Sequence, residues 1–207
     1  MLFRSKLFLI QQMLPEVQAV RAAYVRSIPP KPLHFSVRGS KRVIWKPPPW
    51  ARLKVNFDGA VFREDDSTDV GAVIRDEQGF MVVAMAEKIP LPYSVTAVEV
   101  LAAIKTLRFA GDIDLESFIL EGDSKITIDA LVGDNMEHAE FGNLIEEAKW
   151  LSSQFGDVSY SHVRRQGNYA AHNSARHARY VSEFIVWMKD VPPHLSAVIQ
   201  ADLAFFE

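Results

Sequence analysis

The stretch LKVNFDGAVF, Leu53–Phe62, predicts a β-strand that carries a carboxylate in its second half. Apolar and polar residues alternate along its first half, which is the period of two typical of a strand with one buried face. The alternation leads to Asp58, and the two residues that follow, Gly59 and Ala60, leave space beside its side chain. A carboxylate buried at the end of a strand costs free energy unless it is paired or bound to a cation. Asp58 is therefore either a turn-forming residue ahead of a glycine or part of a functional site.

The composition places this strand in a chain with room for one ordinary domain. The chain has 207 residues, of which 48% are hydrophobic, so it can bury a core and still carry additional segments. It contains no apolar run near the roughly 18 residues that a membrane span requires. Because it has no cysteine, a disulfide scaffold and a thiolate zinc site are excluded.

The first fifty residues differ from the rest in charge and composition. They hold nine Lys and Arg residues and a single acid, Glu16, although the whole chain has a net charge of -3. Residues 1–27 are expected to form a helical arm and residues 28–50 a Pro-rich basic linker without a core of its own, ahead of a domain at 51–182 and a tail at 183–207. The basic arm has two interpretations, a contact with a polyanion or a solvated tail. The expected compartment is the nucleus or the cytoplasm, and an organelle is the alternative because the start of the chain faintly resembles a transit peptide.

The remaining pattern predicts strands and helices in the order βββαβαβα. Three strands are expected at residues 52–62, 70–76 and 80–89, joined by turns into an antiparallel meander. Helices are expected at 94–112, over most of 125–155 with a break near Gly133, and at 168–181. Two short strands, at 117–124 and 157–163, complete the pattern. This order predicts an α/β fold with a mixed sheet flanked by helices.

Two further acids occupy positions that resemble the position of Asp58. Glu99 lies within the first predicted helix among small apolar residues, and Asp123 closes the fourth strand. Taken singly, Glu99 could be a helix-surface residue and Asp123 an N-cap. Three converging carboxylates would repel one another unless divalent cations neutralise them, and Mg²⁺ prefers such oxygen ligands. Two ions held about 3.5–4 Å apart would then support hydrolysis of a phosphodiester.

Four motifs carry a resemblance to a known family: PPPWARLKVNFDGA, AVEVLAAIKTL, LEGDSK and HVRRQGNYAAHNSARHA. Over about residues 47–178 the chain resembles the type 1 ribonuclease H domain, and more narrowly its plant, retroelement-derived version. The resemblance implies a five-stranded ribonuclease H-like fold and an endonuclease that hydrolyses the RNA strand of RNA–DNA hybrids with two ions, Mg²⁺ or Mn²⁺. It assigns Asp58 to both metal ions, Glu99 to one of them, and Asp123 to a position next to the site of attack.

The last motif departs from the general pattern of the family. His172 stands where the family has the aspartate of the last helix, and the resemblance makes it the fourth catalytic and metal-binding residue. An imidazole removes one negative charge and suits Mn²⁺ better than Mg²⁺, so weaker Mg²⁺ binding is expected. Contacts with nucleic acid are expected from Gly59, Arg164, Arg165 and Asn168, although both arginines could instead be solvated loop cations.

The sequence leaves other kinds of protein open. His172 and the excess of acidic over basic residues after residue 50 also fit a catalytically weak or inactive nucleic-acid-binding module. The chain could also be a retroelement remnant without a role of its own. A related exonuclease is disfavoured, because Asn56 stands two residues ahead of Asp58, where such enzymes carry another acid. His162 is expected to alternate within the last strand. The expected state is a monomer without membrane contact.

Overall fold

The computed structural model describes residues 44–62, 67–92, 94–133, 141–188 and 190–205. The predicted helical arm at 1–27 and most of the linker at 28–50 lie outside the described residues. Within the described part of the chain, no helix is long and apolar enough to cross a membrane.

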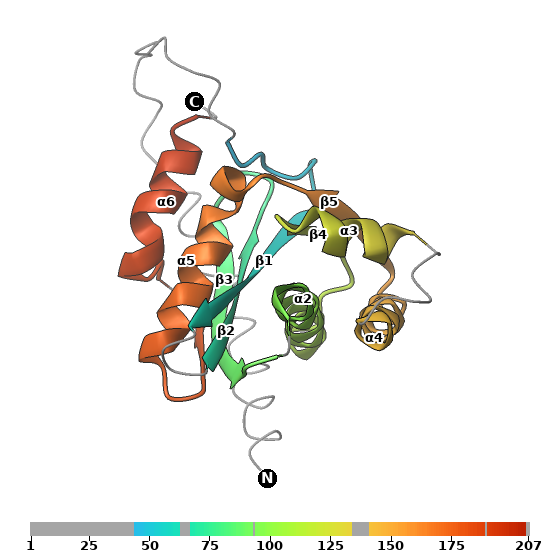
Figure 1. Cartoon of the computed structure of the whole chain (residues 1–207). Coiled ribbons are helices and arrows are strands. Elements are labelled where there is room, and N and C mark those ends of the chain that lie inside the picture. Colours follow the sequence, from blue (N-terminus) through green and yellow to red (C-terminus); the bar gives the residue numbers. More distant parts are fainter. Residues whose placement is uncertain (1–43, 63–66, 93, 134–140, 189, 206–207) are drawn as a thin grey trace.

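The centre of the molecule is one mixed six-stranded sheet in the order β5-β4-β1-β2-β3-β6 (Figure 1). Strands β1 (Leu53–Phe62), β2 (Ser67–Arg75) and β3 (Met81–Pro90) form the expected antiparallel meander. Strand β4 (Ser117–Gly122) runs parallel to β1, and β5 (Asp157–His162) runs parallel to β4. The predicted α/β class with a mixed sheet is confirmed.

Helices cover both faces of this sheet, as Figure 1 shows. On one face lie α2 (Val95–Asp112), α3 (Lys125–Val132) and α4 (Gly142–Ser152), and on the other α5 (Tyr169–His177) and α6 (Pro193–Leu203). Two short 3-10 helices, η2 (Arg165–Asn168) and η3 (Ala178–Tyr180), flank α5. The starts of α2 and α3 follow from their N-caps, because the hydroxyl oxygens of Ser94 and Ser124 accept hydrogen bonds from backbone N–H groups three residues on. The predicted helical region at 125–155 is divided, as expected, into α3 and α4.

The end of the chain differs from its prediction as a tail. Strand β6 (Phe184–Trp187) pairs antiparallel with β3 and makes the sheet one strand wider than the five strands expected. Helix α6 then packs through Leu195 and Ile199 against a small apolar cluster on the sheet that includes Val73 and Ala84. Burial of these side chains and closure of an exposed sheet edge explain why the segment is ordered.

The described end of the predicted linker also belongs to the fold. Trp45 is fully buried, its indole N–H donates to Asn56 Oδ1 at 2.8 Å, and the guanidinium of Arg75 stacks on its ring at 3.4 Å. The ammonium of Lys54 donates to the backbone oxygen of Lys46 at 2.7 Å. The expectation that the linker has no part in a core is therefore wrong for this end, because Trp45 fills space beside a buried arginine.

Two glycines let helices approach the sheet closely. A Cβ atom at Gly71 in β2 would lie 2.0 Å from the backbone nitrogen of Ala175 in α5. A Cβ atom at Gly59 in β1 would lie 2.4 Å from a methyl group of Val98 in α2. Any side chain at either position would push a helix away. Gly71 therefore sets how near α5 lies to β2, and Gly59 sets how near α2 lies to β1.

Candidate active site

Two acids meet at one end of the central parallel strands. The register of β1 and β4 pairs Asn56 with Glu121, and Asp58 and Asp123 follow two residues later on their chains. Asp58 is fully buried in β1, and Asp123 lies just after β4, before the N-cap that starts α3. Because parallel strands end at the same edge of a sheet, the two carboxylates are brought together.

The third acid comes from the helix that crosses this end. Glu99 lies in the second turn of α2 and is only 9% exposed. Gly59 lies directly after Asp58, and its lack of a side chain admits Val98, the neighbour of Glu99. One carboxylate oxygen from each of Asp58, Glu99 and Asp123 lies within 4.8 Å of the others. The convergence expected from the sequence is present.

The charges in this cluster are poorly compensated. Burial, and then the negative charges of Asp58 and Asp123, raise the pKa of Glu99 to about 9. Burial also raises the pKa of Asp58, with a smaller contribution from Asp123, while the hydrogen bond with His172 and the charge of Arg165 act against it. Glu99 Oε2 is buried without a hydrogen-bond partner among the described residues. An uncompensated oxygen within a cluster of carboxylates fits a bound divalent cation, since hard ions prefer such ligands.

Arg165 partly supplies the missing positive charge. Its Nη1 donates to Asp58 Oδ1 and to Asp123 Oδ2, each at 2.9 Å, and its Nη2 lies 2.7 Å from His172 Nδ1. The same His172 nitrogen lies 2.8 Å from Asp58 Oδ2. Since one ring nitrogen either accepts or donates, it can take a hydrogen bond from Arg165 or give one to Asp58, but not both at once. Arg165 and His172 thus join the acid cluster; the resemblance had placed His172 there, whereas Arg165 was expected to contact nucleic acid.

The other residues expected to touch nucleic acid lie in different surroundings. Asn168 is fully buried, and its amide donates to the backbone oxygen of Phe57 at 2.8 Å and accepts from Asn56 at 3.1 Å. This geometry makes Asn168 a residue that fixes the loop holding Arg165. Arg164 is exposed on that loop. His162 is the last residue of β5, as expected, and its Nε2 lies 3.2 Å from the backbone oxygen of Asp123.

A polar network behind Asp58 was not found from the sequence. Asn56 is fully buried and contacts four side chains: it accepts from Trp45 and Arg75 and donates to Glu121 and Asn168. Glu121 pairs with Lys54 at 3.0 Å and accepts from Ser161 at 2.7 Å. The signal for this network was the polar side of the first strand, which a period of two assigns to solvent but whose Asn56 contacts Trp45, Arg75 and Asn168.

A mixed sheet whose central parallel strands bring two acids together, with a third from the crossing helix, defines a ribonuclease H-like domain. The chain belongs to the reverse transcriptase-like family, whose model matches residues 56–178.

Solved structures agree with this assignment. RNase H1 from Halobacterium salinarum is 26% identical, covers 63% of this chain and 98% of its own, and superposes with a TM-score of 0.57. The N-terminal RNase H domain of rv2228c from Mycobacterium tuberculosis is 20% identical over 72% of this chain and 97% of its own, with a TM-score of 0.54. LC11-RNase H1, solved in complex with an RNA/DNA hybrid, is 16% identical over 61% and 96%, with a TM-score of 0.53. At this identity the last two show the fold alone. No curated protein matches the chain.

Proposed function

We propose that this protein is a metal-dependent ribonuclease H that hydrolyses the RNA strand of RNA–DNA hybrids. The observation that carries the proposal is the convergence of Asp58, Glu99 and Asp123 within 4.8 Å, from three separate elements. The similarity to a protein called RNase H1, and the fold shared with one solved on an RNA/DNA hybrid, support the substrate.

The three acids would hold the catalytic ions, and His172 would be the fourth ligand. Mg²⁺ or Mn²⁺ bound there would activate a water and stabilise the leaving oxygen of the phosphodiester. Asp58 would orient His172 through the 2.8 Å contact between its Oδ2 and the histidine Nδ1. Glu99 holds a proton at neutral pH in the absence of a cation, because burial and the charges of Asp58 and Asp123 raise its pKa to about 9. Arg165 balances the charge of Asp58 and Asp123, and its side chain, 45% exposed, can also reach toward a phosphate.

The presence of His172 leads to a specific prediction about which metal ion the protein prefers. A neutral imidazole in the place of a fourth carboxylate weakens Mg²⁺ binding and favours Mn²⁺. His172→Asp should therefore tighten Mg²⁺ binding and shift the metal preference of the protein toward Mg²⁺. Tight Mg²⁺ binding by the wild-type protein, with no change in the variant, would contradict the role given to His172.

The decisive experiment is cleavage of a hybrid labelled on its RNA strand by the purified protein, with Mg²⁺ and Mn²⁺ tested separately. Asp58→Asn is the control, because it removes one negative charge from the cluster and preserves the shape of the side chain. Cuts in the RNA strand that disappear in this control establish the enzyme. Cleavage that persists in Asp58→Asn arises elsewhere and refutes the proposed site.

A second candidate is a nucleic-acid-binding module with little or no turnover. The observation that favours it is Arg165, whose guanidinium already bridges Asp58 and Asp123 and so competes with a cation for the same oxygens. In this case the wild-type protein binds the hybrid but leaves it uncut with either ion. Binding without cleavage would therefore identify the protein as a binding module, and cleavage would identify it as an enzyme.

A further inference from the structure

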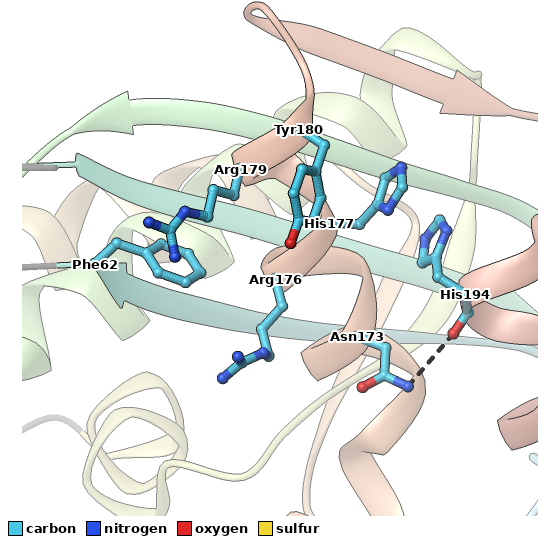
Figure 2. A pocket seen from close by; sticks show the side chains of 7 residues that line it. All are labelled: Phe62, Asn173, Arg176, His177, Arg179, Tyr180 and His194. Carbon is cyan, nitrogen blue, oxygen red and sulfur yellow. Dashed lines mark hydrogen bonds between the residues drawn. The ribbon is translucent and has the colours of Figure 1, made fainter. Parts of the chain in front are cut away.

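A second site lies further along the line where α5 runs beside β1. The contacts Asn168 to Asn56 and His172 to Asp58 show that the two elements run side by side in the same direction. One helical turn beyond His172 and four residues beyond Asp58, a pocket of about 260 Å³ opens. Its seven lining residues include Phe62 at the end of β1 and Arg176 on α5 (Figure 2). We call it the arginine pocket, because Arg176 and Arg179 dominate its charge.

Two guanidinium groups lie over one aromatic ring in this pocket. The guanidinium carbon of Arg179 lies 5.0 Å, and that of Arg176 5.9 Å, from the centroid of Phe62. Figure 2 shows both side chains pointing to the same side of the helix as Phe62. A guanidinium over a ring can still donate through N–H groups that lie in its own plane. Within the described part of the chain Arg176 makes no ion pair.

The opposite wall of the arginine pocket is aromatic and rigid. The rings of His177 and His194 are stacked 3.8 Å apart at an interplanar angle of 2°, and Trp187 contacts both at their edges. Burial, and then the charge of His177, lowers the pKa of His194 to about 4, so His194 is neutral at physiological pH. Tyr180, 80% exposed, stands beside His177 at the mouth of the pocket. The wall therefore adds shape and an exposed phenol, while the arginines supply the positive charge.

The position of the arginine pocket relates it to the acid cluster. Asp58 and Phe62 lie on the same side of β1, since they are four residues apart, and their Cα atoms are separated by about 13 Å. Each strand of a nucleic-acid duplex carries one phosphate per about 3.4 Å of its axis. A phosphate held in the pocket would thus lie about 13 Å from the acids, a few nucleotides along the bound strand.

We propose that the arginine pocket binds a backbone phosphate of the nucleic-acid substrate, a few nucleotides from the bond next to Asp58. Paired guanidinium groups match the geometry of phosphate oxygens and hold them through charge-assisted hydrogen bonds. The inference rests on the proposed function for its substrate, but it concerns binding and not the chemical step. Such a contact positions the strand in the acid cluster without reading its sequence.

The test compares two double variants that each remove two positive charges. Arg176→Gln with Arg179→Gln neutralises the arginine pocket. Arg108→Gln with Lys149→Gln is the matched control, because these residues lie on α2 and α4, across the sheet. Binding of a fluorescent RNA–DNA hybrid is measured with chelator present, over about 50 to 200 mM salt. The pocket variant should lose affinity on the order of tenfold, and the slope of log affinity against log salt should fall by about 2.

A second measurement uses hybrids of increasing length on one side of a fixed cut site. Wild-type affinity should rise once the strand reaches the arginine pocket, and the pocket variant should show no such rise. The proposal would be overturned if both double variants lost equal affinity for the hybrid or if the wild type did not bind it. It would also be overturned if the difference in affinity between the wild type and the pocket variant did not depend on hybrid length. If the wild type cuts and the cuts depend on Asp58, the proposed function survives that result. If the wild type binds the hybrid through the arginine pocket but never cuts it, the proposal for the pocket is supported and the proposed enzymatic activity is refuted.

Discussion

The buried carboxyl of Glu99 makes the stability of the metal-free protein depend on pH in a measurable direction. Its pKa is raised from 4.5 to about 9, first by burial and then by the charges of Asp58 and Asp123. Between these two values the folded protein holds a proton that the unfolded chain has released. The folded state therefore binds more protons, and the contribution of Glu99 to the free energy of unfolding falls as pH rises through this window. Below pH 4.5 both states are protonated, and this contribution no longer varies with pH.

Glu99→Gln removes this dependence, because an amide of nearly the same shape does not titrate. One pH unit within the window corresponds to about 1.4 kcal/mol. From about pH 6 to about pH 8, the free energy of unfolding of the variant should therefore rise relative to the wild type by about 3 kcal/mol. This figure follows from the width of the interval, and it holds as long as both ends lie between the unfolded and the folded pKa.

Urea denaturation at several pH values, with chelator present, measures this difference. Glu146→Gln, on the exposed surface of α4, is the matched control and should run parallel to the wild type. Parallel curves for Glu99→Gln and the wild type would refute the reasoning. Saturating Mn²⁺ should stabilise the wild type most at high pH, because the cation binds the ionised carboxylate.

Three further substitutions test other parts of the structure. Arg165→Gln should cost only about 1 kcal/mol in the metal-free protein, because the guanidinium is 45% exposed, but it should enlarge the thermal stabilisation by Mn²⁺. A smaller Mn²⁺-induced shift than in the wild type would contradict competition between Arg165 and the cation. Gly71→Ala places a Cβ atom 2.0 Å from the nitrogen of Ala175 and should cost about 3 kcal/mol in urea denaturation and slow hybrid cleavage, whereas unchanged stability would mean that α5 can shift freely. Asp202→Asn leaves Arg75, fully buried and 2.6 Å from that carboxylate, without its counter-charge; a loss of about 3 kcal/mol is expected, and a wild-type urea midpoint would count against this role.

Local patterns were sufficient to predict most of the fold. The alternation in residues 53–57 predicts β1, and the starts of α2 and α3 are also fixed locally, although the serine N-caps at Ser94 and Ser124 were found only in the structure. The chain order of strands and helices predicts the mixed sheet. Strand β6 was not predicted, because a strand of four residues shows little periodicity. Its stability comes from pairing with the edge of β3, which is far away in sequence.

The candidate site shows the same division. The sequence by itself determined which acids could form it, since Asp58, Glu99 and Asp123 each interrupt an apolar segment at the end of a strand or inside a helix. It also identified Arg165 and His172 through the resemblance of the last motif. What it could not supply was the engagement of Arg165 with two carboxylates at 2.9 Å, because that contact joins residues more than forty positions apart.

Tertiary structure alone decided the environment of the polar residues. Lys54 and Asn56 belong to the polar side of an alternating strand, yet both are buried, because Trp45 and Asn168 pack against a side that a period of two assigns to water. Trp45, which the sequence assigned to a linker, is likewise buried, with its ring stacked on Arg75. Hydrophobic periodicity records which side chains avoid water, but whether a polar side chain is buried depends on what packs over it, and only the folded chain determines that.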